Sequence, residues 1–190
     1  MNRFDILIKR IFDVCLSFFG VLITLPIIIS CWVIASIETK SNGFFFHERI
    51  GLNGRHFKMY KIKTMHNNDQ KNTITTSNDE RLTFSGKIFR KFKLDELPQL
   101  INVLKGEMSL VGPRPLFEED SGYFDKKYMR RLNVMPGMTG LLQINERNTD
   151  DFEIWYKYDI EYIENWNLYL DIKILLKTFG ALKNKSTSGK

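Results

Sequence analysis

Uncharged, mostly apolar residues fill the chain from Val14 to Ile37, a run of 24 positions. A helix rises about 1.5 Å per residue, so this run would form a helix of about 36 Å, enough to cross a hydrocarbon core of roughly 30 Å. Pro26 lies near the middle of the run. Proline removes one helical hydrogen bond and disturbs the carbonyl four residues earlier, here that of Leu22. The pattern therefore predicts a membrane helix with a weak point at its centre.

Basic residues lie on both sides of this segment: Arg3, Lys9, Arg10, Lys40, Arg49 and Arg55. Because positive charge favours the cytoplasmic side, both ends are expected there. A re-entrant helix broken at Pro26 would satisfy this, with each half reaching about 18 Å and the hydroxyls of Thr24 or Ser30 available to the broken backbone. A single spanning helix stays open, because proline also occurs in such helices. A signal peptide is disfavoured, since its apolar region usually has about 7–15 residues.

Two aromatic-rich runs, residues 44–49 and 57–63, predict a pair of strands. The sequence Gly51-Leu52-Asn53-Gly54 separates them, and Asn-Gly is a strong hairpin signal. In the second strand, the period of two places Lys61 and Lys63 on one face. That face is either solvated or positioned to meet a diphosphate.

Apolar residues at helical spacing mark four later segments, residues 87–92, 97–104, 152–163 and 172–179. The first is basic and amphipathic, so it suits either a bilayer surface or the protein's own core. Gly106 closes the second, and Asp171 is typical of a first-turn acid in the last. The predicted fold class is α+β and helix-dominated, with one β-hairpin and several amphipathic helices. The predicted domains are a membrane helix–break–helix (1–40), a main domain (41–182) and a disordered tail (183–190).

Composition limits the class of protein. With 190 residues and 43% hydrophobic content, the chain is long and apolar enough for one folded domain. The formal net charge of +6 suits an anionic partner, namely a membrane surface, a nucleic acid or a phosphorylated substrate. Cys15 and Cys31 lie within the apolar run, and neither they nor the three scattered histidines show the spacing of a zinc site.

An acidic pair, Asp95 and Glu96, precedes the apolar stripe that begins at Leu97. Aspartate before an apolar run is a common helix N-cap, because its carboxylate accepts a hydrogen bond from a free backbone N–H. On local sequence alone, a cap is the favoured interpretation. A helix start also favours phosphate and other negative groups, so the pair also fits chemistry on phosphates at a bilayer surface.

Several further blocks occur in a fixed order over nearly the whole chain. After the apolar segment they are Glu48-Arg49-Ile50-Gly51, Tyr60-Lys61-Ile62-Lys63-Thr64-Met65, Asp95-Glu96-Leu97-Pro98-Gln99-Leu100, Asn102-Val103-Leu104-Lys105-Gly106-Glu107-Met108-Ser109, Gly112-Pro113-Arg114-Pro115, Pro136-Gly137-Met138-Thr139-Gly140 and Leu170-Asp171-Ile172-Lys173. In this order they resemble the bacterial sugar transferase family, also called monotopic phosphoglycosyl transferases. Because 13 residues precede the apolar segment, the chain is similar to the minimal catalytic form of that family.

The resemblance implies transfer of a phosphosugar from a UDP-sugar to polyprenyl (undecaprenyl) phosphate, with release of UMP, which initiates a lipid-linked glycan. It also implies a re-entrant helix with both ends on the cytoplasmic face of the bacterial inner membrane, and it makes residues 41–182 the catalytic domain. In the family pattern the residue matching Asp95 is the nucleophile, which forms a covalent phosphosugar intermediate. Adjacent helical residues point about 100° apart, so Glu96 cannot share the direction of Asp95. Glu96 is therefore expected to assist Asp95 in a metal-linked or orienting role. The expected cofactor is Mg²⁺, with Asp95 and Glu96 as its ligands.

Basic positions of the family motifs supply the remaining site residues. Lys61, Arg90 and Arg114 match them and are expected to bind substrate phosphates. For Arg90, contact with a lipid headgroup is the alternative. The residues expected to line the nucleotide-sugar pocket are Thr139, Gln143 and Arg147.

The chain departs from the family pattern at two places. Family members often carry Ser before the central proline, where this chain has Leu25, so a broken helix would need another hydroxyl, with Thr24 as the candidate. Ser41-Asn42-Gly43 stands where a Ser-Pro-Gly-Pro-like turn is common. Neither departure touches the acidic pair.

Two other classes of function are kept as alternatives. A non-catalytic membrane scaffold of a polysaccharide assembly would use the acidic pair only as a cap, and enzymatic turnover separates it from the enzyme. A basic nucleic-acid binder would explain the charge but neither the apolar segment nor the acidic pair, and no recognition signature is present. Salt-sensitive DNA binding would be needed to support it.

Overall fold

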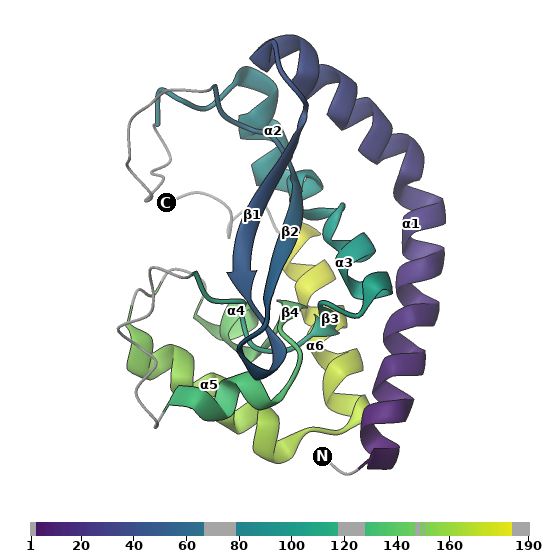
Figure 1. The fold of residues 1–190 in the computed structure, drawn as a ribbon, viewed down its shortest axis with the longest axis vertical. Helices are drawn as coiled ribbons and strands as arrows, with labels where there is room; N and C mark the ends of the chain where they lie inside the picture. The colour runs from purple at the N-terminus through teal and green to yellow at the C-terminus, as the bar shows by residue number, and fades with distance from the viewer. Residues whose placement is uncertain (1–2, 67–78, 118–127, 147–148, 150, 184–190) are drawn as a thin grey trace.

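The computed structural model describes residues 3–66, 79–117, 128–146, 149 and 151–183. One long helix, α1 (Arg3–Thr39), curves along one side of a body built from a β-hairpin and shorter helices (Figure 1). The helix-dominated α+β class predicted from the sequence is confirmed.

Helix α1 continues through Pro26 without an interruption. The hydroxyls of Thr24 and Ser30 donate to the carbonyls of Gly20 and Pro26, at 2.7 and 2.8 Å. Hydroxyl bonds to the carbonyl four residues earlier often bend helices, and α1 curves over the body (Figure 1). These hydroxyls therefore do not donate to the Leu22 carbonyl, which Pro26 leaves without its usual helical donor. The re-entrant break at Pro26 stays a prediction.

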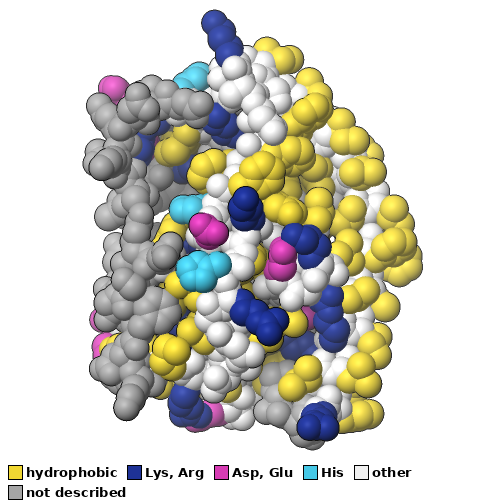
Figure 2. All heavy atoms as spheres, in the orientation of Figure 1, with side chains coloured by type: hydrophobic (Ala, Val, Ile, Leu, Met, Phe, Trp, Pro, Cys, Tyr) yellow, Lys and Arg dark blue, Asp and Glu magenta, His cyan; other side chains and the backbone are white. Residues whose placement is uncertain are grey.

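The outward side of α1 is apolar along its length. In the described part of the chain, α1 is the one helix that is long and apolar enough to cross a membrane. Large side chains such as Phe19 and Ile23 are 60% and 75% exposed, and hydrophobic atoms follow the helix in Figure 2. An exposed apolar surface of this extent marks an interaction site, which makes α1 the membrane-associating element.

The predicted β-hairpin is confirmed. Strands β1 (Phe44–Ile50) and β2 (His56–Ile62) pair antiparallel. Asn53 and Gly54 adopt left-handed backbone conformations in the turn, with φ of 54° and 75°, which is the geometry that Asn-Gly tolerates. Lys63 follows the end of β2 and donates to Ser41 Oγ at 2.7 Å, so only Lys61 of the two lysines points toward the acidic pair.

The segment around the acidic pair contains three short helices. Helix α2 (Phe84–Phe92) is followed by a 3-10 helix, η2 (Leu94–Glu96), and then by α3 (Gln99–Lys105). Gly106 ends α3 with φ of 81°, as predicted from its position. Helix α2 buries Phe89 and exposes Ile88, so it packs on the core and also presents an apolar outer side.

A second pair of strands was not predicted. Strands β3 (Ser109–Val111) and β4 (Gly137–Thr139) pair in parallel. Beyond them the backbones nearly touch, because Gly112 N–H donates to the Thr139 carbonyl at 2.9 Å and Gly137 N–H to the Pro113 carbonyl at 2.8 Å. A Cβ on Gly137 would collide with the Gly112 backbone. The two glycine-bearing motifs therefore form one joint that fixes the loop carrying Arg114.

The remaining elements complete the body beneath the hairpin. They are a 3-10 helix η4 (Tyr128–Asn133), α4 (Leu141–Asn145), α5 (Phe152–Asn165) and α6 (Leu168–Lys183). Helices α5 and α6 match two of the predicted amphipathic segments. Lys183 belongs to α6, so the helix extends one residue into the predicted tail; residues 184–190 lie outside the described residues.

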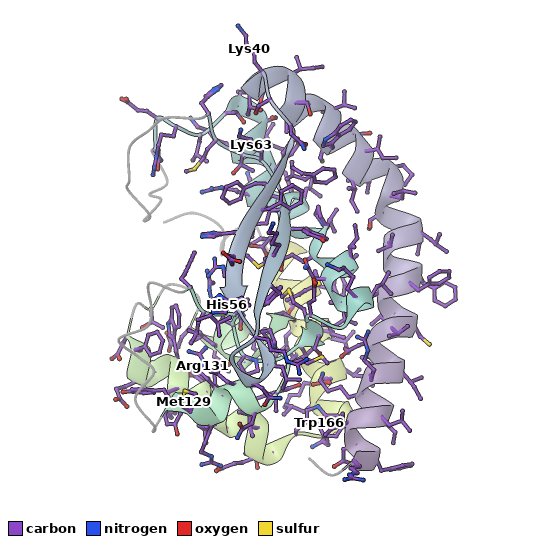
Figure 3. All side chains as sticks on the ribbon, viewed as in Figure 1. Lys40, His56, Lys63, Met129, Arg131 and Trp166 are labelled. Carbon is purple, nitrogen blue, oxygen red and sulfur yellow. The ribbon has the colours of Figure 1, made fainter. Side chains whose placement is uncertain are left out.

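Buried polar contacts join the start of α1 to the body. Lys9 Nζ lies 2.7 Å from Asp171 Oδ2, and Ser109 Oγ donates to Asp13 Oδ2 at 2.7 Å. Asp171 also accepts from Tyr162 Oη and from Trp166 Nε1, at 2.8 and 3.2 Å. Trp166 lies beside the N-terminal end of α1 (Figure 3). Asp171 is thus in the first turn of α6, as predicted, but its main contacts are these buried donors.

The second half of α1 packs on the elements around the acidic pair. Ile28, Cys31 and Ala35 form a buried cluster with Ile62 of β2 and Phe89 of α2, and Leu94 of η2, which carries the acidic pair, packs against that cluster. The membrane-associating helix and the acidic pair therefore belong to one packed unit.

Candidate active site

Asp95 is a buried carboxylate without a hydrogen-bond partner for one of its oxygens. It lies in η2, is 6% exposed, and its Oδ1 accepts no hydrogen bond. Neither η2 nor α3 has a side-chain cap; their N-cap positions are Lys93 and Pro98. The interpretation of Asp95 as a helix cap is therefore wrong. Buried polar atoms are nearly always paired, so an unpaired one calls for a functional explanation.

Positive side chains from β2, from α2 and from Lys93, the residue between α2 and η2, act on the acidic pair. Lys61 Nζ of β2 lies 3.6 Å from Glu96 Oε1, and Lys93 Nζ lies 3.2 Å from the same oxygen. Arg90 of α2 donates from Nε to Thr64 Oγ1 at 2.9 Å, and its charge acts on Asp95. The cations thus converge on two adjacent carboxylates.

The two carboxyl groups have opposite pKa shifts. Burial, with Glu96 as a neighbouring negative charge, raises the pKa of Asp95 although Lys61 and Lys93 oppose this. Burial also acts to raise the pKa of Glu96, but the ammonium groups of Lys61 and Lys93 lower it overall. Divergent environments for two adjacent acids are typical of sites with divided roles. Glu96 is the ion-paired member, and Asp95 is the member that retains an unpaired oxygen.

Arg114 reaches the site from the loop after β3. It is exposed, its guanidinium lies 5.8 Å from the centre of the Trp155 ring, and its charge helps to lower the pKa of Glu96. Its carbonyl accepts from Arg131 at 3.0 Å, and Arg131 is paired with Asp159 at 2.8 Å. Of the three predicted phosphate ligands, Lys61 lies 3.6 Å from Glu96, and the charges of Arg90 and Arg114 help to lower the pKa of Asp95 and of Glu96, respectively.

For the residues predicted to line the nucleotide-sugar pocket, the structure shows no contact with the acidic pair in the part of the chain that it describes. Thr139 is buried at the end of β4, and its hydroxyl shares a 2.8 Å hydrogen bond with that of Thr178. Gln143 of α4 has an amide oxygen that is buried without a hydrogen-bond partner. Arg147 lies outside the described residues. The pocket role of these three residues stays a prediction.

Two residues of the site escaped sequence reasoning. Lys93 stands next to the acidic motif, yet its contact with Glu96 was not predicted. Asn102 is fully buried and fastens α3 to β2, because its side chain accepts from Tyr60 N–H at 3.0 Å and donates to the Lys58 carbonyl at 2.7 Å. These bonds hold Lys61 opposite Glu96. The positive charge adjoining the acidic pair was the available signal for Lys93. Asn102 begins one of the family blocks, but no local pattern indicated its contacts with β2.

The acidic pair fits a divalent cation that is shared with a substrate. Among the described residues, no group of three or more His, Cys, Asp or Glu side chains could hold a metal by itself. Mg²⁺ usually takes one or two carboxylates together with substrate phosphates and water. The unpaired Oδ1 of Asp95 beside the Glu96 carboxylate supplies such a donor set.

The site therefore combines a buried carboxylate, several neighbouring cations and a membrane-associating helix. This combination is typical of membrane enzymes that act on phosphorylated substrates. Residues 4–185 match the family model described as "Bacterial sugar transferase". The chain belongs to this family and is a sugar-phosphate transferase. Family membership sets aside the non-catalytic scaffold.

Individual relatives, two of similar length and one much longer, extend the comparison. The chain is 40% identical to the "Uncharacterized sugar transferase EpsL" of Bacillus subtilis over 90% of this chain and 85% of that protein. It is 35% identical to the "Exopolysaccharide production protein ExoY" of Rhizobium meliloti over 92% and 84%. The "UDP-glucose:undecaprenyl-phosphate glucose-1-phosphate transferase" of Klebsiella pneumoniae is 38% identical over 98% of this chain but 42% of its own length.

Proposed function

We propose that the protein transfers a phosphosugar from a UDP-sugar to polyprenyl phosphate, with release of UMP, as the initiating step of a lipid-linked glycan. The observation that carries the proposal is the buried Asp95, with its unpaired Oδ1 among Lys61, Lys93 and Arg90. The relatives support the substrate classes. The Klebsiella relative is named for a UDP-sugar donor and an undecaprenyl-phosphate acceptor, as is a relative of Aeromonas hydrophila.

In the first step, an Asp95 carboxylate oxygen attacks the phosphorus that bears the sugar. An Asp–O–P bond forms, and the P–O bond to the bridging oxygen breaks, so that UMP leaves with that oxygen. The cations serve this step because they offset the repulsion between an anionic nucleophile and an anionic diphosphate. Burial makes the negative charge of Asp95 unfavourable in the free site. Because this charge is lost when the carboxylate oxygen bonds to phosphorus, burial favours the attack.

In the second step, a phosphate oxygen of the polyprenyl phosphate attacks the same phosphorus. A new P–O–P bond forms, the acyl-phosphate bond breaks, and Asp95 regains its carboxylate. With a fully ionised acceptor, the two displacements consume and release no proton, so no general base is needed. Covalent catalysis of this kind replaces one difficult displacement with two easier ones.

Lys61, Arg90 and Arg114 are proposed to bind the phosphates of the substrates. Arginine presents a planar fork that matches phosphate oxygens, whereas lysine supplies a point charge. Mg²⁺ is proposed as the cofactor, held by Asp95 and Glu96, where it would neutralise charge on the diphosphate. Thr139, Gln143 and Arg147 are proposed to line the nucleotide-sugar pocket.

The polyprenyl chain is proposed to approach along α1. The second half of α1 contacts both β2 and α2, so a lipid phosphate beside it would meet the cations of the site. The proposed location is the cytoplasmic face of the bacterial inner membrane, with both ends of a re-entrant α1 on that side.

The test of function measures UMP released by the purified full chain with Mg²⁺, polyprenyl phosphate and a panel of UDP-sugars. Asp95→Asn is expected to abolish UMP release. Asp151→Asn is the matched control, because Asp151 caps α5 through Glu153 N–H at 2.9 Å and Asn caps as well as Asp. UMP release that Asp95→Asn leaves unchanged would refute the nucleophile.

Topology needs a separate test. Single cysteines introduced at residues 2 and 184, in a variant without Cys15 and Cys31, are labelled in intact and permeabilised cells. Both are expected to react only after permeabilisation. Labelling of one from outside would establish a spanning helix and contradict the re-entrant arrangement.

A further inference from the structure

Lys93 occupies an unusual backbone position next to the acidic pair. Its φ and ψ are 58° and 24°, which is the left-handed region, and lysine rarely adopts it. The residue ends α2, because its N–H donates to the Arg90 and Phe89 carbonyls, and it begins η2. This conformation places its side chain beside the acids that follow it.

The ammonium groups of the site are distributed unequally between the two carboxylates. Lys93 Nζ and Lys61 Nζ lie 3.2 and 3.6 Å from the same oxygen, Glu96 Oε1. Asp95 Oδ1, by contrast, has no hydrogen-bond partner and lies in a side chain that is 6% exposed. One carboxylate thus has two cations, while an oxygen of its neighbour is left without a donor.

A divalent cation shared by Asp95 and Glu96 would meet repulsion from both ammonium groups. The Lys93 side chain is 43% exposed, against 24% for Lys61, and it has a flexible stem that reaches water. Lys61 is fixed in a strand whose backbone is bound by Asn102. Lys93 is therefore the cation that is free to leave Glu96.

We propose that Lys93 exchanges partners: it pairs with Glu96 in the free site and with the substrate diphosphate once a divalent cation has bound the acidic pair. The proposal rests on the proposed function, since it takes the diphosphate as the second partner. Without nucleotide, Lys93 competes with the cation for Glu96. With nucleotide, its charge stabilises the same complex. Cation and nucleotide consequently bind with positive coupling, and Lys93 carries a large part of that coupling.

The experiment measures Mn²⁺ binding to the full chain by electron paramagnetic resonance, with and without UDP, after subtraction of Mn²⁺ bound by UDP alone. Lys93→Gln is expected to bind Mn²⁺ about tenfold more tightly without UDP, the order expected when a unit charge near a divalent ion is removed in a water-like dielectric. The gain in Mn²⁺ affinity caused by UDP is expected to fall by a similar factor. Lys93→Arg, which keeps the charge, should behave as the wild type.

Lys91→Gln is the matched control, because Lys91 lies on the same helix with its ammonium 5.8 Å from the centre of the Phe92 ring. The proposal would be overturned if Lys93→Gln bound Mn²⁺ as Lys91→Gln does, both with and without UDP. Should Lys93→Gln fail to fold, Lys93→Asn provides the same titration, since Asn tolerates the left-handed region better.

UMP release by the same wild-type preparation separates the two proposals. Wild-type UMP release together with unchanged coupling in Lys93→Gln overturns the role of Lys93 alone. Loss of coupling in Lys93→Gln without wild-type UMP release overturns the proposed function and leaves the partner exchange in place.

Discussion

Asp171→Ala is expected to loosen α1 from the rest of the protein. The Asp171 side chain is fully buried and accepts from Lys9 Nζ at 2.7 Å, from Tyr162 Oη at 2.8 Å and from Trp166 Nε1 at 3.2 Å. Alanine would leave all three donors without this acceptor. Because the Lys9 side chain is 10% exposed, water cannot replace the lost partner fully.

The free-energy change follows from the buried ion pair. Removing one partner of a buried ion pair costs about 3–5 kcal/mol, and an unsatisfied buried donor costs about 1–3 kcal/mol. These terms overlap within one network. Lys9 Nζ keeps Asp13 Oδ2 at 3.8 Å, and Tyr162 Oη keeps the Val111 carbonyl at 3.0 Å, so the lower value of about 3 kcal/mol is expected for Asp171→Ala. For a chain of this size, 1 kcal/mol shifts the melting temperature by about 2–4 °C. The expected loss is therefore roughly 6–12 °C.

The assay is thermal unfolding of the protein in detergent, followed by intrinsic fluorescence. The control is Asp171→Asn, which removes the charge but keeps a side-chain oxygen that can accept from Lys9, Tyr162 or Trp166. This variant should therefore melt above Asp171→Ala. A melting temperature of Asp171→Ala within about 2 °C of the wild type would refute the reasoning, as would an Asp171→Asn variant that is no more stable.

Two further predictions concern the site and its support. Gly137→Ala is expected to lower stability by about 2 kcal/mol or more and to reduce UMP release, because its Cβ would collide with the Gly112 backbone and displace the loop that carries Arg114. Gly180→Ala, which has no atom within 4 Å of a new Cβ, is the control and should be neutral or stabilising when melting temperatures are compared. The raised pKa of Asp95 lies above its unfolded value of 3.8, so the folded state binds this proton more tightly. The stability of the wild type relative to Asp95→Asn should therefore fall as pH rises from 3.8 through the folded pKa, and equal melting differences at pH 4 and pH 8 would contradict the shift.

Elements governed by local rules could be predicted from the sequence. The hairpin follows from Asn53 and Gly54, whose left-handed conformations need residues of this kind. Gly106 ends α3 for the same reason. The ring of cations at the site was predicted only in part, since Lys61, Arg90 and Arg114 were assigned through the family motifs and not through their own neighbours.

Contacts between distant segments could not be predicted in this way. Strands β3 and β4 have three residues each and no alternating pattern, so no local signal marks them. Asp171 fits a first-turn acid by position, but its partner Lys9 lies 162 residues away. Such pairings depend on the fold as a whole, because burial and a matching charge are decided only when the segments meet.

The most instructive error concerns Asp95, and the sequence does contain the signal that corrects it. An N-cap carboxylate accepts from the N–H two or three positions later. Three positions after Asp95 stands Pro98, which has no N–H. Two positions after it stands Leu97, whose N–H donates to the Leu94 carbonyl at 3.3 Å within η2. Both cap partners are therefore removed, one by proline and one by the 3-10 turn. A cap bond would have stabilised the ionised carboxylate and occupied one of its oxygens. The segment Leu94–Pro98 thus places an acid at a helix start while denying it the bond that a helix start normally provides. This leaves an oxygen of Asp95 unpaired, as the proposed nucleophile or metal ligand requires.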